Sequence, residues 1–290
     1  MSLLIAIING VMVGGLYGLF GLGLALAFGI MRVVNIAHGE FIVLGAYLGA
    51  ALLSVMPLNI FVVVCLVAII AFGVGWLLQF SLLNRLIGPN PVPAMIATMG
   101  LSIIIRNALV SVFGTDIRAI DLGSLQDAGI TLFGVSIGIL PLIIFAIAIV
   151  LFLAVGALMT RTTIGRAFRA AADDFEILET LGFDRRKVYA SAMGLAIMLA
   201  AVAGLLLAVR SSFSPYSGVE RLLISFEVVI IGGLGSLRGS LIAGIFLGVV
   251  QVVGLKLNPN SGPLFSHLAF LLILLVRHFD VTFLFARKKI

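Results

Sequence analysis

The sequence predicts an all-α membrane protein, a polytopic transmembrane bundle of about eight to ten helices, some of them short or broken. Composition gives the first reason. Of the 290 residues, 62% are hydrophobic and 10% are charged, with a mean hydropathy of +1.30, whereas about a quarter of the residues in a soluble domain are charged. Length gives the second, because several apolar runs reach the roughly 20 residues that cross about 30 Å of hydrocarbon. We expect residues 1–290 to form one transmembrane domain.

Nine apolar segments are candidate spans. They are Leu3–Met31, Ala37–Met56, Ile60–Leu83, Val92–Phe113, Leu132–Met159, Val188–Val209, Leu222–Leu234, Ser240–Leu255 and Leu264–Val276. The seventh and the ninth are too short to cross upright, and the last third of the chain is rich in glycine. Such segments indicate either broken or re-entrant helices around a cavity, or tight helix packing through small residues. The glycines concerned are Gly232, Gly233, Gly235 and Gly239.

The positions of Lys and Arg predict how the chain is oriented. If the N-terminus lies outside, thirteen of the eighteen Lys and Arg residues fall on the cytoplasmic side. The outer loops then hold Arg118, Arg210, Arg221 and Lys256, and Arg106 lies within a span. Because short cytoplasmic loops are enriched in Lys and Arg, we expect the N-terminus outside and the C-terminus in the cytoplasm. The net charge of +6 is then explained by the orientation of the helices in the membrane, and we expect no nucleic-acid partner.

Residues that carry catalysis or bind cofactors are scarce. No G-x-x-x-x-G-K-S/T sequence occurs, so the chain has no P-loop for ATP. The single cysteine, Cys65, lies in an apolar run, and the three histidines lack the spacing of a metal site. We therefore expect no enzyme activity, no metal site and no cofactor in this chain.

One stretch is strongly charged. Eleven charged residues fall between Thr160 and Tyr189, so we expect residues 160–187 to form a cytoplasmic loop. Thr163 can cap a short helix at the start of this loop. Such a loop could rest on the lipid surface as an amphipathic connector, or it could contact a soluble partner.

A second short helix is predicted over residues 174–181 of the same loop. Asp173 and Glu176 have the spacing of a capping box, in which each side chain accepts a backbone N–H of the other residue. Gly182 would end the helix, because glycine readily adopts the left-handed conformation of the residue after a helix. Asp184 would then start the next helix.

Four segments resemble one family, the permeases of bacterial ABC importers for branched-chain amino acids. Residues 165–188, GRAFRAAADDFEILETLGFDRRKV, are similar to its cytoplasmic loop. Residues 17–49 resemble its early signature, and residues 97–107 and 232–248 resemble two further segments. The chain departs from the family pattern at Arg106, where relatives usually carry an uncharged residue, and in its C-terminal tail.

The resemblance implies a coupling helix that docks into a cleft on an ATPase. Its residues would be Arg169, Ala170, Ala171, Asp173, Asp174, Glu176, Leu178, Leu181 and Gly182. The resemblance further implies two cytosolic ATPase subunits that bind ATP and Mg, a second related permease or a second copy of the chain, and an extracytoplasmic solute-binding protein. The location that it implies is the bacterial inner membrane.

The sequence thus favours a transmembrane permease subunit that moves a small polar solute into the cytoplasm by alternating access, driven by separate ATPases. Branched-chain or other amino acids are the solutes that the resemblance implies, with urea and amides as alternatives. Candidate residues of the translocation path or its gate are Asn35, His38, Glu40, Arg106, Asn107 and Glu227.

These candidates also have structural interpretations. A charge at the bilayer centre costs roughly 2.5–3.5 kcal/mol on insertion scales, so Arg106 and Glu227 could pair with one another or contact a zwitterionic solute. Asn35 could cap the second span, with His38 and Glu40 either in a gate or satisfying the backbone. The alternative function is an ion- or proton-coupled secondary transporter, for which Glu227 and Glu40 are the acidic residues at suitable positions.

Overall fold

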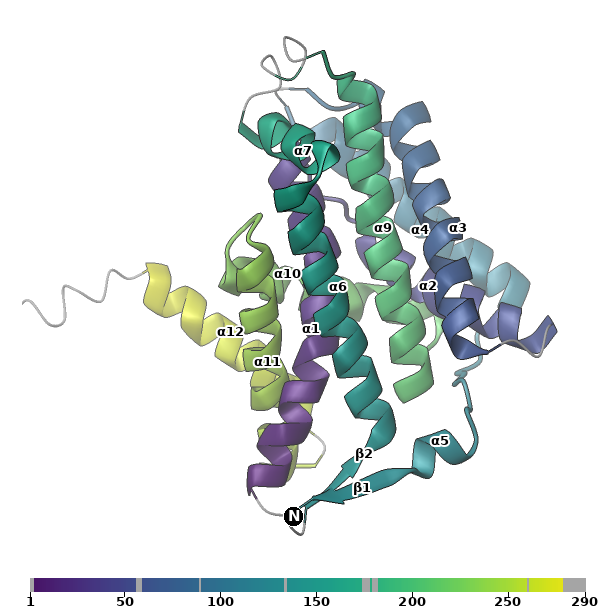
Figure 1. Cartoon of the computed structure of the whole chain (residues 1–290), viewed down its shortest axis with the longest axis vertical. Helices are drawn as coiled ribbons and strands as arrows, with labels where there is room; N and C mark the ends of the chain where they lie inside the picture. The colour runs from purple at the N-terminus through teal and green to yellow at the C-terminus, as the bar shows by residue number, and fades with distance from the viewer. Residues whose placement is uncertain are drawn as a thin grey trace, which may run out of the picture.

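The computed structural model describes residues 3–55, 59–88, 90–132, 135–173, 178, 182–259 and 261–278. Within these ranges, seven helices are long and apolar enough to cross a membrane. They are α1 (Leu3–Met31), α2 (His38–Val55), α3 (Ile60–Ser81) with the 3-10 helix η1 (Leu83–Arg85), α4 (Val92–Phe113), α6 (Ile139–Arg161), α9 (Arg185–Arg210) and α11 (Leu237–Leu257). The predicted polytopic helical bundle is confirmed, with the largely buried α1 and α9 among its core helices (Figure 1).

The remaining described elements are shorter. The helices are α5 (Ser124–Asp127), α7 (Thr163–Asp173), η2 (Pro215–Ser217), α10 (Gly218–Gly232) and α12 (Gly262–His278). Two strands, β1 (Gly129–Leu132) and β2 (Val135–Gly138), form an antiparallel hairpin before α6. All nine predicted spans therefore coincide with helices, and α10 and α12 are the two short ones.

The fifth predicted span, Leu132–Met159, begins too early. The structure places β2 before Ile139, and α6 starts only at that residue. The hairpin pairs Ile130 with Ile137, so an apolar run there belongs to strands. Mean hydropathy cannot separate a short apolar strand from the first turns of an apolar helix.

The bundle has two ends, which lie at the top and bottom of Figure 1. One end carries α7, the end of α6 and the start of α9, and we call it the α7 face. The opposite end carries the β1–β2 hairpin and the N-terminus, and we call it the hairpin face.

α1 packs against α11 through glycines. A Cβ placed on Gly14 would lie 2.3 Å from the Cα of Ile245, and one on Gly244 would lie 2.3 Å from the backbone nitrogen of Gly18. Real side chains do not approach so closely, so the two backbones touch because these positions lack a Cβ. Such contacts supply the van der Waals packing that associates helices in lipid.

α9 packs against α2 in the same way. A Cβ on Gly204 would lie 1.7 Å from the carbonyl oxygen of Ile42, and one on Gly45 would lie 2.1 Å from that of Ala201. α2 is thereby fixed against the buried helix α9.

α2 and α10 begin inside the bundle. Their first turns touch, because a Cβ on Gly39 would lie 2.0 Å from the carbonyl oxygen of Gly218. α10 then runs toward the α7 face, where Gly235 in the following turn packs on Gly29 near the end of α1. α10 therefore spans only part of the depth of the bundle, as expected of a broken or re-entrant helix.

The four glycines singled out in the sequence form the connection between α10 and α11. Gly233 and Gly235 have φ angles of +93° and +81°, in the left-handed region that favours glycine. A Cβ on Gly239 would lie 1.8 Å from the carbonyl oxygen of Gly232, so the two helices meet backbone to backbone. Close packing and a tight turn account for all four positions.

The charged loop begins with α7, whose cap differs from the prediction. The hydroxyl of Thr162, and not that of Thr163, accepts a hydrogen bond from the Gly165 N–H at 3.1 Å. The reason is that α7 starts at Thr163, so the preceding residue occupies the capping position. Of the predicted second helix, residues 174–177 and 179–181 lie outside the described residues.

The residues that follow the predicted second helix are described, and their backbone agrees with the prediction. Gly182 has a φ angle of +79°. The N–H of Phe183 donates to the carbonyl of Leu178 at 3.2 Å, the longer hydrogen bond of a Schellman motif. The Asp184 carboxylate then accepts the N–H of Arg186 at 2.9 Å and caps α9, as predicted.

The glycine contact between α2 and α9 can be tested by Gly204→Val. The valine would overlap the α2 backbone at Ile42, so we expect a loss of stability of about 1–3 kcal/mol or more. Thermal unfolding of the purified protein in detergent measures it. Gly156→Val is the matched control, because no described atom lies within 4 Å of its Cβ position. An equal effect of both variants would contradict the packing argument.

Candidate functional site

A buried ion pair lies where α2 and α10 begin. Glu40 on α2 is 2% exposed, and Arg106 on α4 is 28% exposed. Both Nη2 and Nε of the arginine donate to Oε1 of the carboxylate, at 2.5 Å and 3.1 Å. Charges at membrane depth normally have partners of this kind. The second oxygen, Oε2, has no hydrogen-bond partner among the described residues.

The start of α10 packs directly on this ion pair. A Cβ on Gly218 would lie 2.4 Å from the Glu40 carboxylate, so a glycine is needed there. The first turns of α2 and α10 and the middle of α4 thus meet at one polar point inside an apolar bundle. We call these residues, Glu40, Arg106 and Gly218, the central ion-pair site.

Asn35 and His38 have structural roles beside this site. The Asn35 side chain accepts the N–H of Ala37 at 3.0 Å and so caps the turn that leads into α2. The imidazole Nε2 of His38 lies 2.9 Å from the carbonyl oxygen of Phe20 in α1. The interpretation that these polar groups satisfy the backbone is therefore observed for both residues.

Asn107 lies next to Arg106 but faces outward. Its side chain is exposed on α4 and donates to the carbonyl of Ile103 at 2.8 Å. η2, which packs against α4, and the start of α10 expose Tyr216 and Val219. Polar groups exposed at this depth need water or a protein partner, because lipid cannot satisfy them.

Glu227 has a different partner from the one considered in the sequence. It is 1% exposed on α10, and its carboxylate lies 2.5 Å from Nδ1 of His267 on α12. The possibility that Arg106 and Glu227 pair with one another is therefore wrong, because each is paired with another residue. Two charges in separate helices can each find a nearer partner, which spacing along the chain does not reveal.

Sequence reasoning missed a third polar contact inside the bundle, besides the Glu40–Arg106 and Glu227–His267 pairs. The Tyr17 hydroxyl on α1 donates to the side-chain oxygen of Gln251 on α11 at 2.5 Å. A lone glutamine in an apolar span was the available signal, because such a residue needs a partner within the bundle.

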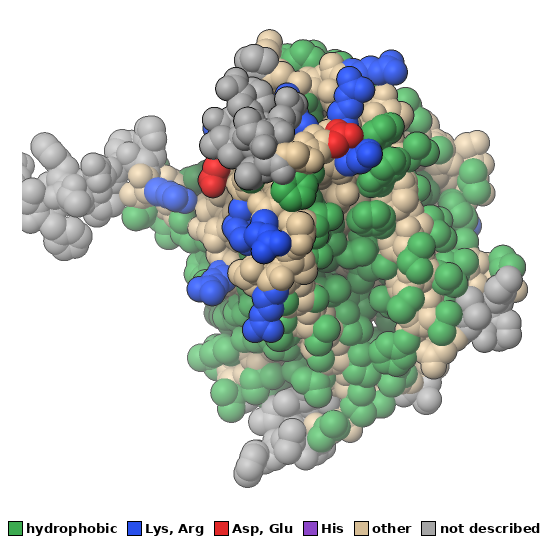
Figure 2. All heavy atoms as spheres, turned by 45° about the horizontal axis from the view of Figure 1, so that its top comes forward, with side chains coloured by type: hydrophobic (Ala, Val, Ile, Leu, Met, Phe, Trp, Pro, Cys, Tyr) green, Lys and Arg blue, Asp and Glu red, His purple; other side chains and the backbone are tan. Residues whose placement is uncertain are grey.

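The α7 face carries most of the positive charge. Figure 2 shows Lys and Arg side chains gathered there, over and around α7. The described basic residues at this end are Arg32, Arg85, Arg161, Arg166, Arg169, Arg185, Arg186, Lys187, Arg238 and Arg277. The hairpin-face half holds Arg118, Arg210, Arg221 and Lys256.

The predicted coupling residues are only partly described. Arg169, Ala170, Ala171 and Asp173 lie in the second half of α7, where Arg169 is exposed and Ala171 is buried. Leu178 is fully buried, and Gly182 is exposed. Asp174, Glu176 and Leu181 lie outside the described residues.

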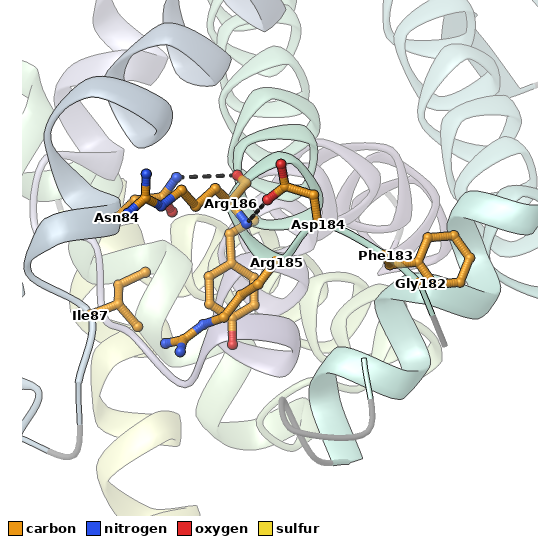
Figure 3. A pocket seen from close by; sticks show the side chains of 8 residues that line it. Asn84, Ile87, Gly182, Phe183, Asp184, Arg185 and Arg186 are labelled. Atoms are coloured by element: carbon orange, nitrogen blue, oxygen red, sulfur yellow. Dashed lines mark hydrogen bonds between the residues drawn. The ribbon is translucent and has the colours of Figure 1, made fainter. Parts of the chain in front are cut away.

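A cavity of about 650 Å³ opens beside the end of this loop (Figure 3). We call it the α9 pocket, and its lining residues are Asn84, Ile87, Gly182, Phe183, Asp184, Arg185, Arg186 and Tyr189. It lies between the end of α3 and the start of α9.

These features define a class of protein. A multi-pass helical bundle with paired charges at mid-depth, partial-depth helices and one strongly basic face is typical of a membrane transport protein. Residues 6–277 match the family described as "Branched-chain amino acid transport system / permease component", so the chain belongs to this family. It is a multi-pass permease component.

The chain is similar to curated permeases over nearly its whole length. It is 27% identical to the high-affinity branched-chain amino acid transport system permease protein BraD of Pseudomonas aeruginosa, covering 98% of this chain and 96% of the relative. It is 29% identical to LivH of Salmonella typhimurium, covering 92% and 91%. It is 26% identical to LivM of Escherichia coli, covering 85% and 63%.

The central ion pair can be tested with Arg106→Gln. This change leaves the Glu40 carboxylate buried without a cation, so we expect a loss of about 1–3 kcal/mol, less than for a fully buried pair because Arg106 is 28% exposed. The double variant Glu40→Gln with Arg106→Gln should recover part of the loss. Thermal unfolding of the four proteins of this cycle measures the coupling, and strictly additive effects would contradict the pairing.

Proposed function

We propose that this chain is the membrane-spanning subunit of an ABC importer that moves a small amino acid, above all a branched-chain one, into the cytoplasm. The observation that carries the proposal is the family match across residues 6–277. The names of BraD and LivH supply the solute class. The chain itself has no P-loop sequence, so ATP and Mg would be bound by two separate cytosolic ATPase subunits.

The α7 face is the cytoplasmic end in this proposal. Ten described basic residues lie at this end and four lie in the opposite half of the bundle, which is the asymmetry that the positive-inside rule requires. The chain would then lie in the inner membrane with its N-terminus outside and its C-terminus in the cytoplasm.

In this proposal α7 transmits the movement of an ATPase to the transmembrane helices on which it packs. A Cβ on Gly165 would lie 2.1 Å from the carbonyl oxygen of Leu158, so α7 packs tightly on the end of α6. The Arg32 guanidinium, between α1 and α2, donates to the carbonyl of Ala172 in α7 at 3.3 Å. A displacement of the loop would therefore move α6, α1 and α2 together, the rigid-body motion that alternating access needs.

The path for the solute would follow the exposed face of α4 and the start of α10. Arg106 and Asn107 lie on this side of α4, and Glu220 at the start of α10 is 49% exposed. A second permease facing this side would enclose these polar groups in a water-filled path. Solute selection would rest mainly with an extracytoplasmic binding protein.

The second permease would be a related chain rather than a copy. Escherichia coli has both LivH and LivM as permease proteins of the high-affinity branched-chain amino acid transport system, and this chain is similar to both. Identity is higher and coverage more complete for LivH, so this chain would take that position in the pair.

Two experiments test the proposal. The chain is extracted from its native membrane in mild detergent, and its stoichiometric companions are identified by mass spectrometry. An ATPase and a second permease are expected, and a chain that remains alone after crosslinking would contradict the importer.

The second experiment measures uptake after ATP depletion with the ion gradient maintained. Loss of uptake is expected, whereas continued uptake would favour the ion-coupled secondary transporter.

Gly182→Val tests the coupling role of the loop. A β-branched residue is strained at a φ angle of +79°, so the end of the preceding helix should shift. We expect uptake to fall about tenfold or more while membrane insertion stays normal. Gly182→Asn is the matched control, because asparagine tolerates the left-handed conformation and should retain most of the uptake. Normal uptake by the valine variant would remove Gly182 from the coupling loop.

Thiol labelling tests the orientation. In a Cys65→Ser background, cysteine is placed at Thr163 on the α7 face or at Asp121 near the hairpin face, both exposed positions. A membrane-impermeant maleimide added to intact cells should label the Asp121 variant, and the Thr163 variant only after the membrane is opened. The reverse pattern would invert the proposed topology.

A further inference from the structure

The α9 pocket lies where two spans end. Its walls come from η1 and Ile87, which follow α3, and from the first two turns of α9 together with the residues just before it. At this level, transmembrane helices leave the hydrocarbon and meet the lipid headgroups. A ligand bound here can have a polar part in the pocket and an apolar part in the bilayer.

The charges around the pocket favour an anion. Arg185 and Arg186 line it, and the exposed Arg85 directly follows the lining residue Asn84 in η1. Asp184 is the acidic group in the described lining, and its carboxylate already caps α9 and lies 3.8 Å from Nζ of Lys187. The described groups therefore leave a net positive charge at the pocket.

The backbone at the pocket is held by hydrogen bonds that do not involve the guanidinium of Arg186. The Asn84 side chain donates to the backbone carbonyl of Arg186 at 3.1 Å and accepts from the Gln79 side chain at 3.0 Å. The guanidinium of Arg185 lies 5.2 Å from the centre of the Tyr189 ring, which orients it. Figure 3 shows the Arg186 side chain extending toward Asn84, beside the opening.

An exposed apolar surface runs along α3 toward the pocket. Val74, Leu77 and Phe80 are exposed on its last turns. Trp76 stacks on Phe80 with ring centroids 4.9 Å apart. Aromatic side chains gather at the level of the headgroups, and exposed aliphatic ones contact acyl chains.

We propose that the α9 pocket binds the phosphate headgroup of an anionic phospholipid. Arg186 and Arg85 contact the phosphate, and the acyl chains lie on the exposed surface of α3. Basic pockets between transmembrane helices hold such headgroups. The bound lipid links the end of α3 to the start of α9, beside Gly182, and so braces the end of the charged loop.

Trp76 provides a local test, because it is the single tryptophan of the chain. The purified full-length chain is placed in phosphatidylcholine vesicles, and its fluorescence is quenched with brominated phosphatidylglycerol or brominated phosphatidylcholine. We expect brominated phosphatidylglycerol to quench the Trp76 fluorescence at a much lower mole fraction than brominated phosphatidylcholine. The double variant Arg85→Gln with Arg186→Gln should weaken this preference by a factor on the order of 10. The hydrogen bond from the Asn84 side chain to the backbone carbonyl of residue 186 does not depend on the arginine side chain, so this variant keeps it.

Controls separate the pocket from general attraction to the charged face. The variant Arg161→Gln with Arg238→Gln removes the same charge elsewhere on the α7 face and should keep the preference. Equal quenching by the two lipids in the unmodified chain would overturn the proposal. Loss of the preference for phosphatidylglycerol when inorganic phosphate is added at constant ionic strength would also overturn the proposal, because it would indicate a site for free phosphate. Loss of the preference when the companion ATPase is added would assign the pocket to that subunit instead.

Discussion

Contact between helix backbones at glycines is the constraint on which this structure depends. Lipid tails are as apolar as the helices, so burial of apolar surface gives little reason for helices to associate in a bilayer. Close packing has to supply the attraction. In this chain it does so along α1 and α11 at Gly14 and Gly244, and between α2 and α9 at Gly45 and Gly204. These contacts place α1 and α9 in the core and arrange the other helices around them.

The same close packing lets two helices begin inside the bundle. α2 and α10 begin beside one another because neither Gly39 nor Gly218 has a side chain to hold them apart. Their first turns then lie where the Glu40–Arg106 pair satisfies two charges at membrane depth. The central ion-pair site is thus a consequence of the packing, and it lies beside the exposed face of α4 that we propose for the solute path.

The two ends of the bundle differ for an electrostatic reason. Arginines and a lysine gather around α7 and the start of α9, and these charged groups keep this end in water and headgroups. The charged loop is attached through Gly165 to α6, which packs on α1, and through Arg32 to the end of α1 itself. A force applied to this face would therefore be transmitted to α1 in the core. A lipid bound in the α9 pocket would stabilise the contact between the end of α3 and the start of α9 at the same face.

The sequence by itself determined the class, the spans and the ends of several helices, because hydropathy, charge asymmetry and capping residues act locally. The turn at Gly182 and the cap at Asp184 are examples. It could not determine that Arg106 pairs with Glu40 and Glu227 with His267, nor that residues 129–132 and 135–138 pair as strands. Those outcomes depend on which helices become neighbours. Only the tertiary structure decided that, through backbone contacts between glycines far apart in the chain.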